Sequence, residues 1–260
     1  MAEHALITGA SSGIGLELAK IAAANNINLI LLARNADRMM QLRTELEERH
    51  SIKVLVVGCD LSEPNTVEKI TALLNSRNIV PDILINNAGF GMFGAFDRIG
   101  PDTEANMIQL NVTSLTDLTK VIYRQMRSRG SGRIMNVSSI AGFMPGPWMA
   151  VYHATKAYVL SLSEALATEA KGSGVTVTAL CPGPTETNFE NRASTGVGIK
   201  AFKKFGKLPT AAQVAEYGWK SMMKGKTVAV HGWKCRWLLF LIRFLPRKTV
   251  ANITGKMQTP

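Results

Sequence analysis

The sequence is poor in the residues that bind metals or form disulfide bonds. Three cysteines and four histidines are scattered through 260 residues, and no two cysteines form a CxxC pair. This pattern predicts neither a disulfide framework nor a metal site, and it fits a reducing compartment. The residues concerned are Cys59, Cys181, Cys235, His4, His50, His153 and His231.

Long hydrophobic runs are also absent. No stretch reaches the roughly 18 apolar residues that a membrane-spanning helix needs. The N-terminal MAEHALITGA has no basic region followed by an apolar run, so we expect no signal peptide and a cytoplasmic location. With 46% hydrophobic and 19% charged residues the chain can nevertheless bury a large core, which excludes a disordered protein.

Acidic residues are scarce in one part of the chain only. Residues 200–260 contain 13 Lys and Arg but the single acid Glu216, whereas residues 1–199 contain 17 Lys and Arg against 18 Asp and Glu. The net charge of +11 therefore arises in the last quarter of the chain. Such an asymmetry predicts an anionic partner for that quarter.

Short apolar runs alternate with amphipathic stretches from residue 4 to residue 232. The runs predict strands at 4–8, 27–33, 53–60, 82–89, 133–139, 175–183 and 227–232. Helices are predicted at 36–50, 64–77 (with Pro64 in the first turn), 103–128, 150–171 and 210–223. Another helix follows the first strand, with Ile14, Leu18, Ile21 and Ala22 on one face. Strict alternation indicates a single doubly wound α/β domain, a parallel sheet of about seven strands with helices on both faces.

The first strand runs into the glycine-rich segment TGASSGIG (8–15). Gly9 lets the chain turn off the strand, and Gly13 and Gly15 let a phosphate and a neighbouring strand approach the backbone. Backbone N–H groups at the start of the next helix can then hold a diphosphate. A tight strand-to-helix turn also needs glycine, but the strand–loop–helix context near the start of an α/β domain favours nucleotide binding.

The segment LLARNADR at the end of the second strand indicates which nucleotide binds. NAD sites usually carry an acid here for the ribose 2′-hydroxyl, whereas NADP sites accommodate the 2′-phosphate with a cation. This chain has Ala33 and then Arg34, with Arg38 one helical turn later, which predicts NADP(H). Ser12 and Asn35 could add hydrogen bonds to the phosphate. The alternative is that Arg34 is only a solvated loop residue.

The segment VYHATKAYVL (151–160) places Tyr152 and Lys156 one turn apart on the same helix face. Both could be ordinary residues of an amphipathic helix. Together with TGASSGIG, NNAG (86–89), PG (182–183) and a serine thirteen residues before Tyr152, however, the pair resembles the short-chain dehydrogenase/reductase family. The resemblance spans about residues 4–232 and is to NADP-dependent bacterial short-chain reductases and ketoacyl reductases. It implies a Rossmann-type fold.

The resemblance implies a catalytic tetrad of Asn111, Ser139, Tyr152 and Lys156. A nearby Lys⁺ and an oxidised nicotinamide would lower the pKa of the tyrosine, which is ordinarily about 10. Tyr152 can then protonate a carbonyl oxygen that Ser139 holds by a hydrogen bond. Lys156 has donors left for the nicotinamide ribose, and Asn111 is expected to hold a water that links Lys156 to solvent. Taken alone, Asn111 could be a plain polar helix residue.

The resemblance also implies the cofactor contacts. The cofactor-binding residues that it predicts are Gly9, Ser11, Ser12, Gly13, Ile14, Gly15, Arg34, Asn35, Arg38, Asp60, Leu61, Asn87, Ala88, Gly89, Tyr152, Lys156, Pro182, Gly183 and Thr187. Asp60 and Leu61 would pack around the adenine, although Asp60 could simply cap a strand end. Asn86 is expected to stabilise the central sheet, and Ser138 is expected to be structural because Ser139 has the family spacing.

The substrate site is predicted less sharply. Residues 184–208 are expected to be a substrate lid, or alternatively a mobile amphipathic helix with a solvated basic face. This segment mixes aromatic and basic residues, namely Phe189, Phe202, Phe205, Lys200, Lys203, Lys204 and Lys207. A pocket for a hydrophobic ketone or acyl chain could be lined by Phe90, Phe93, Phe143, Met144 and Trp148, although core residues have the same character.

These features predict an NADPH-dependent oxidoreductase that transfers hydride between the nicotinamide and a ketone, aldehyde or secondary alcohol. The alternative is a non-enzymatic NADP-binding sensor or membrane-associated scaffold, against which the intact tetrad argues. We expect no nucleic-acid partner and a homo-oligomer, dimer or higher, that pairs helices 103–128 and 150–171. Six side chains could form that interface or face the sheet: Leu110, Leu115, Leu118, Val121, Leu162 and Leu166.

Residues 233–260 form an apolar and basic extension to the predicted catalytic domain, residues 1–232. The apolar run 237–242 is flanked by Lys234, Arg236, Arg243, Arg247 and Lys248. A helix over 234–245 would measure roughly 18 Å, too short for the ~30 Å hydrocarbon core but suited to a bilayer interface. It could instead fold back on its own domain or on a partner subunit and cover the substrate pocket. The positive charge would suit an anionic membrane or a phosphate-bearing acyl carrier.

Overall fold

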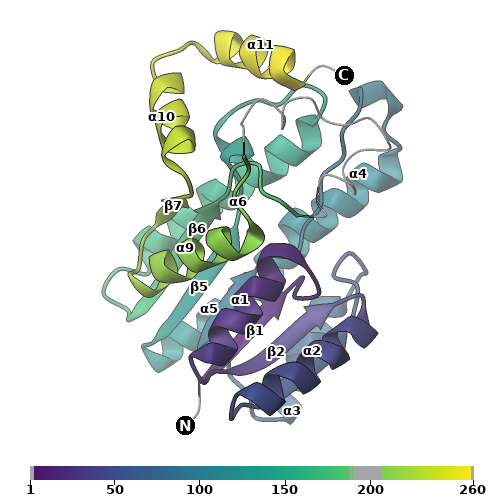
Figure 1. The fold of residues 1–260 in the computed structure, drawn as a ribbon, viewed down its shortest axis with the longest axis vertical. Coiled ribbons are helices and arrows are strands. Elements are labelled where there is room, and N and C mark those ends of the chain that lie inside the picture. The colour runs from purple at the N-terminus through teal and green to yellow at the C-terminus, as the bar shows by residue number, and fades with distance from the viewer. Residues whose placement is uncertain (1–2, 188, 190–206, 259–260) are drawn as a thin grey trace.

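A seven-stranded parallel sheet lies at the centre of the molecule, and helices cover both of its faces (Figure 1). The computed structural model describes residues 3–187, 189 and 207–258. Within these residues the strand order is β3-β2-β1-β4-β5-β6-β7. The strands are β1 (His4–Thr8), β2 (Asn28–Ala33), β3 (Val54–Gly58), β4 (Ile83–Asn86), β5 (Gly132–Val137), β6 (Val175–Cys181) and β7 (Val228–Val230). The predicted doubly wound Rossmann-type fold is confirmed.

The helices are divided between the two faces of the sheet. Helices α1 (Gly13–Ala24), α2 (Ala36–Arg49) and α9 (Ala211–Met223) pack on one face. Helices α3 (Thr66–Ser76), α5 (Leu115–Arg129) and α6 (Ala150–Glu169) pack on the other. Three short elements lie in the connections, the 3₁₀ helices η1 (Phe96–Arg98) and η3 (Ile140–Phe143) and the π-helix η2 (Gln109–Ser114), which follows α4 (Pro101–Ile108). Helices α10 (Trp233–Ile242) and α11 (Arg247–Gln258) lie apart from both layers, at the top of Figure 1.

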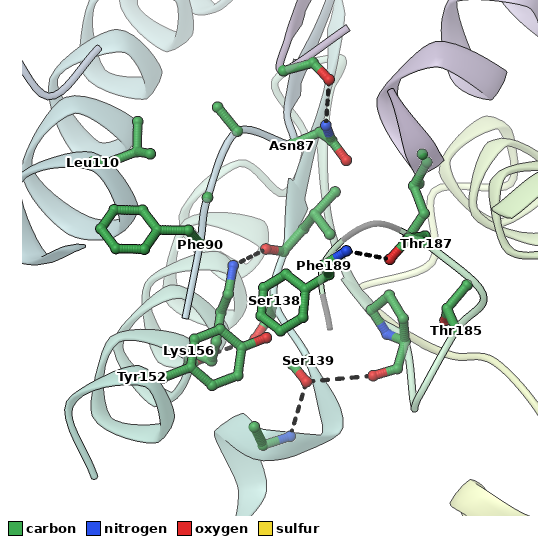
Figure 2. A pocket seen from close by; sticks show the side chains of 18 of the residues that line it. Asn87, Phe90, Leu110, Ser138, Ser139, Tyr152, Lys156, Thr185, Thr187 and Phe189 are labelled. Atoms are coloured by element: carbon green, nitrogen blue, oxygen red, sulfur yellow. Dashed lines mark hydrogen bonds between the residues drawn. The ribbon is translucent and has the colours of Figure 1, made fainter. Parts of the chain in front are cut away.

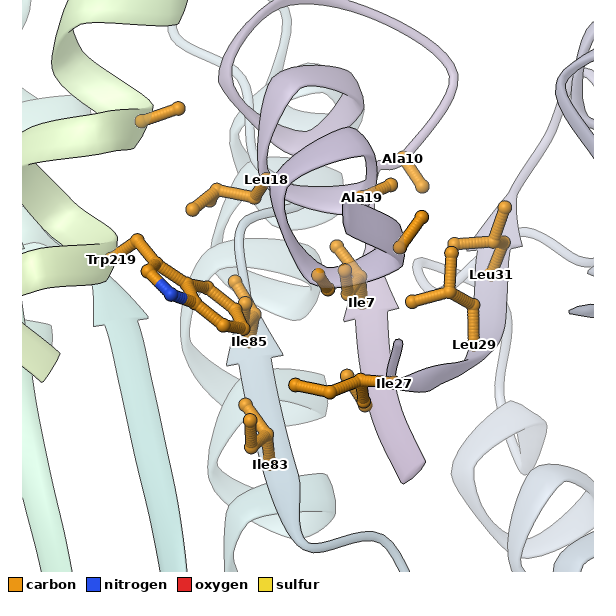
Figure 3. Packing of buried hydrophobic residues seen from close by; sticks show 14 of the residues in the cluster. Ile7, Ala10, Leu18, Ala19, Ile27, Leu29, Leu31, Ile83, Ile85 and Trp219 are labelled. Atoms are coloured by element: carbon orange, nitrogen blue, oxygen red, sulfur yellow. The ribbon is translucent and has the colours of Figure 1, made fainter. Parts of the chain in front are cut away.

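The central strands are apolar on both faces because helices cover both faces. Along β1, Ile7 contributes to the core beneath α1 and its neighbour Leu6 to the core on the opposite face. Figure 3 shows the first of these cores, in which Trp219 of α9 and Leu18 of α1 lie above Ile85 of β4. A slip of one residue would exchange the two faces of a strand, so this packing fixes the register of the sheet.

Several helix boundaries differ from those predicted. Helix α3 begins at Thr66, after Pro64, because Asn65 has a left-handed φ of +59° that a helix cannot include. The predicted helix 103–128 consists of α4, η2 and α5 in succession. Helix α11 was not predicted at all. On α1, Leu18 and Ala22 are buried as expected; Ile14 and Ile21 are only partly buried.

Several of the side chains considered for an oligomer interface pack in the core of the single chain. Leu115 and Leu118 are buried within the single chain. The other four are partly buried: Leu110, Val121, Leu162 and Leu166. Leu118 therefore faces the sheet, and Leu110, Val121 and Leu166 pack beside it in the same core.

The glycine turns that precede β5 and β6 make a testable backbone contact. Gly172 and Gly174 both have left-handed φ values, +78° and +75°. A Cβ atom at Gly174 would overlap the carbonyl oxygen of Gly130, whereas none would be met within 4 Å at Gly172. Alanine at Gly172 should cost about 1 kcal/mol of unfolding free energy for its φ alone. Alanine at Gly174 should cost a further ~1–3 kcal/mol for the overlap. Urea denaturation measures both, and equal losses would contradict the contact.

Candidate active site

The site lies where the order of the strands reverses along the chain. After β1 the chain crosses to β2 on one side, and after β4 it crosses to β5 on the other, so the two connections diverge from adjacent strand ends. Parallel α/β sheets bind ligands in the crevice at such a point. Here a cavity of 620 Å³ opens at the carboxyl ends of the strands. All but two of the predicted site residues line it, the exceptions being Gly15 and Asn111.

The glycine loop forms one wall of this cavity. Gly9 and Gly13 have left-handed φ values of +67° and +56°, which turn the chain off β1 and into α1. Gly15 serves helix–strand packing instead, because a Cβ there would overlap the side-chain nitrogen of Asn87 and the carbonyl oxygen of Gly9. Asn87 Nδ2 donates hydrogen bonds to the carbonyl oxygens of Thr8 (3.0 Å) and Gly9 (3.2 Å). The first turn of α1 therefore faces the cavity, with the backbone close enough for a diphosphate to contact it.

Two arginines lie at the far end of the same cavity, after β2. Arg34 Nη1 is 3.6 Å from Asp60 Oδ2, and Arg38 lines the cavity on the first turn of α2. Asn35 Oδ1 accepts a hydrogen bond from the Arg38 backbone N–H at 2.9 Å, so this side chain caps α2 and is already engaged. Burial opposes ionisation of Asp60, but hydrogen bonds from Ser62 and the charge of Arg34 outweigh it and lower the Asp60 pKa.

Tyr152 and Lys156 face the cavity from α6, one turn apart (Figure 2). Lys156 is 5% exposed, and its Nζ donates a 2.8 Å hydrogen bond to the carbonyl oxygen of Val137, the last residue of β5. The same nitrogen lies 5.9 Å from the centre of the Tyr152 ring. Ser138 Oγ donates to the Lys156 carbonyl oxygen at 2.8 Å and so ties α6 to the end of β5, a structural contact of the kind expected of Ser138.

Ser139 follows β5 directly and begins η3. Its Oγ accepts a hydrogen bond from the Ala141 N–H (3.1 Å) and donates one to the Pro182 carbonyl oxygen (3.4 Å). The Tyr152 side chain lies beside it (Figure 2). The hydroxyl is thus held between the ends of β5 and β6 and beside the phenol, where a substrate oxygen could bond both groups.

Asn111 is fully buried in the π-helix η2, behind the cavity wall. Its Nδ2 donates to the Phe90 carbonyl oxygen (2.9 Å) and to Thr155 Oγ1 (3.1 Å), and its Oδ1 accepts from the Phe90 N–H (3.2 Å). A Cβ at Gly89 would lie 2.9 Å from Asn111 Oδ1 and 3.4 Å from Lys156 Nζ, so the absence of a side chain there keeps the two groups close. Asn111 therefore connects the segment after β4 to α6.

Asn86, at the end of β4, has the sheet-stabilising position that the sequence predicts. Its Nδ2 donates to Thr119 Oγ1 on α5 (2.8 Å) and to Asn136 Oδ1 on β5 (2.9 Å). The Asn86 side chain is buried, so these bonds satisfy both of its donors.

The rest of the cavity is mostly apolar, and much of it comes from the C-terminal helices. Phe90, Met144 and Phe189 line it, and the Phe189 ring lies 5.4 Å from that of Tyr152. The prediction was wrong for three residues: Phe93 and Trp148 pack together beside the site, and Phe143 packs against a separate core cluster. Sequence reasoning did not assign the lining residues Met149, Leu238, Ile242, Val250, Ile253, Thr254, Met257 and Gln258.

The C-terminal extension thus folds back and covers the pocket, one of its two predicted arrangements. Its apolar run, residues 237–242, was the signal for Leu238 and Ile242, but the run alone does not tell which side chains point inward. Of the predicted lid 184–208, residues 188 and 190–206, with Phe202, Phe205, Lys200, Lys203 and Lys204, lie outside the described part of the chain.

Residues 3–197 match the family model of the short chain dehydrogenases. The chain belongs to this family. It is 31% identical over 209 residues to human 17-beta-hydroxysteroid dehydrogenase type 3, covering 80% of this chain and 67% of that protein. It is 31% identical over 186 residues to the very-long-chain 3-oxoacyl-CoA reductase of Bos taurus, covering 70% of this chain and only 59% of that one. A short-chain dehydrogenase from Sphingobium yanoikuyae in complex with NADPH has a TM-score of 0.82 at 29% identity, over 96% of this chain and 99% of that one.

The family assignment makes this protein an oxidoreductase whose fold binds a nicotinamide cofactor. The site fits such a group, because the glycine loop, the two arginines and the buried Lys156 line one continuous cavity. No helix in the described part of this short-chain dehydrogenase is both long and apolar enough to cross a membrane.

Burial determines the pKa of both titrating groups of this short-chain dehydrogenase. It raises the pKa of Tyr152 to about 12, against the opposing effect of the Ser139 hydrogen bond. It lowers the pKa of Lys156 to about 8, against the opposing effect of Cys181. The predicted lowering of the Tyr152 pKa is thus not found in the chain by itself, because desolvation of the phenolate outweighs the opposing effect of Ser139. The phenol stays protonated at neutral pH, as a proton donor must.

The buried Lys156 should make folding stability depend on pH. Its pKa is about 8 in the folded chain, against an ordinary value of 10.5. Between these values the unfolded chain binds more protons, so the free energy of unfolding rises with pH. We expect the urea midpoint of the wild type minus that of Lys156→Met to increase between about pH 8 and about pH 10. Taking the difference cancels the thiols of Cys59 and Cys235, whose raised pKa values act in the opposite sense. A difference independent of pH would contradict the burial of the charge.

Proposed function

We propose that the protein is an NADPH-dependent carbonyl reductase that reversibly reduces a hydrophobic ketone, aldehyde or acyl-type substrate at its carbonyl group to the corresponding alcohol. The observation that carries the proposal is the placement of Tyr152, Ser139 and the buried Lys156 in one wall of the cavity whose opposite end is the glycine loop. When bound, NADP(H) supplies or accepts the hydride.

The residues of the chain divide the remaining work among them. Ser139 holds the substrate oxygen by a hydrogen bond from its hydroxyl, and Tyr152 donates its proton to that oxygen as negative charge develops there. Lys156 uses one donor on Val137 and has two left, for the ribose hydroxyls and for the phenolate that proton transfer leaves behind. Asn111 positions α6 through Thr155. The contacts described above support these assignments.

The choice of NADPH rests on charge at the end of β2. Arg34 and Arg38 line the cavity there, and position 33 is Ala in place of an acid. Asp60 lies 3.6 Å from Arg34, and this weak, half-exposed ion pair leaves most of the Arg34 donors available. The NADPH complex of the related Sphingobium yanoikuyae enzyme supports the same choice.

The apolar lining supports a hydrophobic substrate. The apolar side chains that line the cavity include Phe90, Met144, Met149, Phe189, Leu238, Ile242, Val250, Ile253 and Met257. Relatives named for hydroxysteroids and very-long-chain oxoacyl-CoA agree with this chemistry. We also propose that residues 1–232 form the cofactor-binding and catalytic unit, that 184–208 act as its lid, and that the enzyme works as a homo-oligomer.

Replacing Tyr152 by phenylalanine removes the proton donor and little else. We expect Tyr152→Phe to bind NADPH with nearly unchanged affinity and to lose about 10²–10⁴-fold in kcat, the usual contribution of general acid catalysis. Fluorescence titration measures the first quantity, and NADPH oxidation against a panel of ketones and aldehydes measures the second. Wild-type turnover in this variant would refute the assignment and favour a nucleotide sensor.

Replacing Arg34 by alanine should weaken NADPH binding and leave NADH binding almost unchanged. A charge-assisted contact with the 2′-phosphate is worth about 1.5–3 kcal/mol, or roughly ten- to a hundredfold in Kd. Arg49→Ala is the matched control, because Arg49 is similarly exposed (69% against 73%) but lies at the opposite end of α2. If Arg34→Ala weakens both cofactors equally, Arg34 does not distinguish them.

A further inference from the structure

Helix α10 has one face toward the cavity and the other toward solvent. Cys235 and Leu239 are buried, and Leu238 and Ile242 line the cavity. The opposite side carries large hydrophobic side chains that are 40–72% exposed. We call this side, together with the two hydrophobic residues just after the helix, the outer face of α10. It consists of Trp233, Trp237, Phe240, Leu241, Phe244 and Leu245.

The outer face is a continuous surface. The ring centres of Trp237 and Phe240 are 5.8 Å apart, and those of Phe240 and Phe244 are 5.3 Å apart, both in edge-to-face contact. Six of the thirteen large hydrophobic side chains exposed in the described residues lie in this one segment, 233–245. Single exposed apolar residues are ordinary, but a contiguous patch of them marks an interaction site.

Cations flank this surface. At 100° per residue, Lys234 lies on one side of the aromatic stripe and Arg236 on the other, with Arg243 beside Arg236. Arg247 and Lys248 follow in the first turn of α11. Residues 233–258 contain no Asp or Glu, and none of these cations is ion-paired with a described residue. The surface therefore combines exposed aromatic rings with uncompensated positive charge.

The helix pair is fixed to the body of the protein, so the outer face has a defined direction. Val250 and Thr254 of α11 are buried, and Gln258 Nε2 lies 3.1 Å from Nε2 of His153, the residue after Tyr152. A Cβ at Gly255 would contact Pro147 at 3.2 Å. In Figure 1, α10 and α11 stand at the edge of the molecule beyond the carboxyl ends of the strands. The inner face of α10 can therefore stay on the cavity while its outer face contacts a partner.

We propose that the outer face of α10 inserts into the interface of an anionic lipid bilayer. The aromatic rings and leucines would lie at the headgroup–acyl boundary and the flanking cations on lipid phosphates and carboxylates. A second copy of the chain fits less well as the partner. The charged residues around this face are all cations, so a two-fold contact would place like charges against each other. The two arrangements expected of the extension, docking on the domain and lying on a membrane, are thereby combined in one helix.

The consequence for the enzyme, which rests on the proposed function, concerns substrate entry. Leu238 and Ile242 line the cavity on the same helix whose other side meets the lipid. A hydrophobic ketone dissolved in the bilayer would then reach the cavity along α10 without crossing water.

Vesicle sedimentation of the full-length protein tests the surface. We expect binding to phosphatidylcholine vesicles that contain phosphatidylserine, weaker binding without it, and weaker binding at high salt. The triple variant Trp237→Ser/Phe240→Ser/Phe244→Ser should lower the partition coefficient at least about tenfold, because it removes three of the four aromatic rings of the outer face. Phe96→Ser is the matched control, since Phe96 is 68% exposed on η1 and Phe244 is 72% exposed. NADPH binding, measured on each variant, confirms that the fold is intact.

The proposal would be overturned if the full-length protein stayed in the supernatant with anionic vesicles at low salt. It would also be overturned if Phe96→Ser lost as much vesicle binding as the triple variant. If the full-length protein does not bind vesicles and the triple variant has a lower sedimentation mass than the wild type, the face is a subunit contact and the proposal is overturned. Binding of an acyl carrier protein in place of vesicles would also overturn it.

Reduction of a water-soluble ketone without vesicles tests the reductase separately. The triple variant should keep that activity and lose kcat/KM only for a long-chain methyl ketone presented in vesicles; equal loss on both would refute entry from the lipid.

Discussion

The pairing of β1 with β4 is the constraint on which the whole site depends. Thr8 Oγ1 accepts hydrogen bonds from the backbone N–H groups of Asn87 and Ala88, both at 2.9 Å. The side-chain Nδ2 of Asn87 also donates a hydrogen bond to the Thr8 carbonyl oxygen. These contacts join the glycine loop to the segment after β4, and they need the close approach that Gly15 permits. The two walls of the nucleotide crevice are therefore held together by the protein alone, which is the preorganisation that cofactor binding needs.

The end of the neighbouring strand β5 makes the buried lysine tolerable. An ammonium group with little access to water and no acid beside it is costly, and the Val137 carbonyl oxygen offsets only part of that cost. Burial accordingly lowers the pKa of Lys156 to about 8. Perturbed groups of this kind gather where they have chemistry to perform, because nothing in packing alone would retain them. The π-helix around Asn111 is similar, since its wider turn lets the amide bond the Phe90 backbone.

The sequence predicted what depends on local pattern and failed where tertiary contacts decide. The strands were found because runs buried on both faces are largely apolar, and the site because its motifs follow those strands directly. The π-helix could not be found, because the Asn111 contacts that accompany it reach across to Phe90, far along the chain. Phe93 was misplaced because an apolar side chain has the same character in a core as in a cavity wall. Helix α11 escaped notice because its buried side, with Val250 and Thr254, exists only once it docks.

The C-terminal helices form part of the cavity lining but carry none of the proposed catalytic residues. Tyr152, Lys156 and Ser139 lie on α6 and at the end of β5, elements that the core of the sheet holds in place. A large share of the apolar lining comes instead from residues 238–258, which lie beyond the family match at 3–197 and add nothing to the sheet. Changes on the inner faces of α10 and α11 can therefore alter the shape of the cavity without moving the reacting groups. Changes on the outer face of α10 leave both unaltered, which is why aromatic exposure there needs an explanation outside catalysis and outside folding.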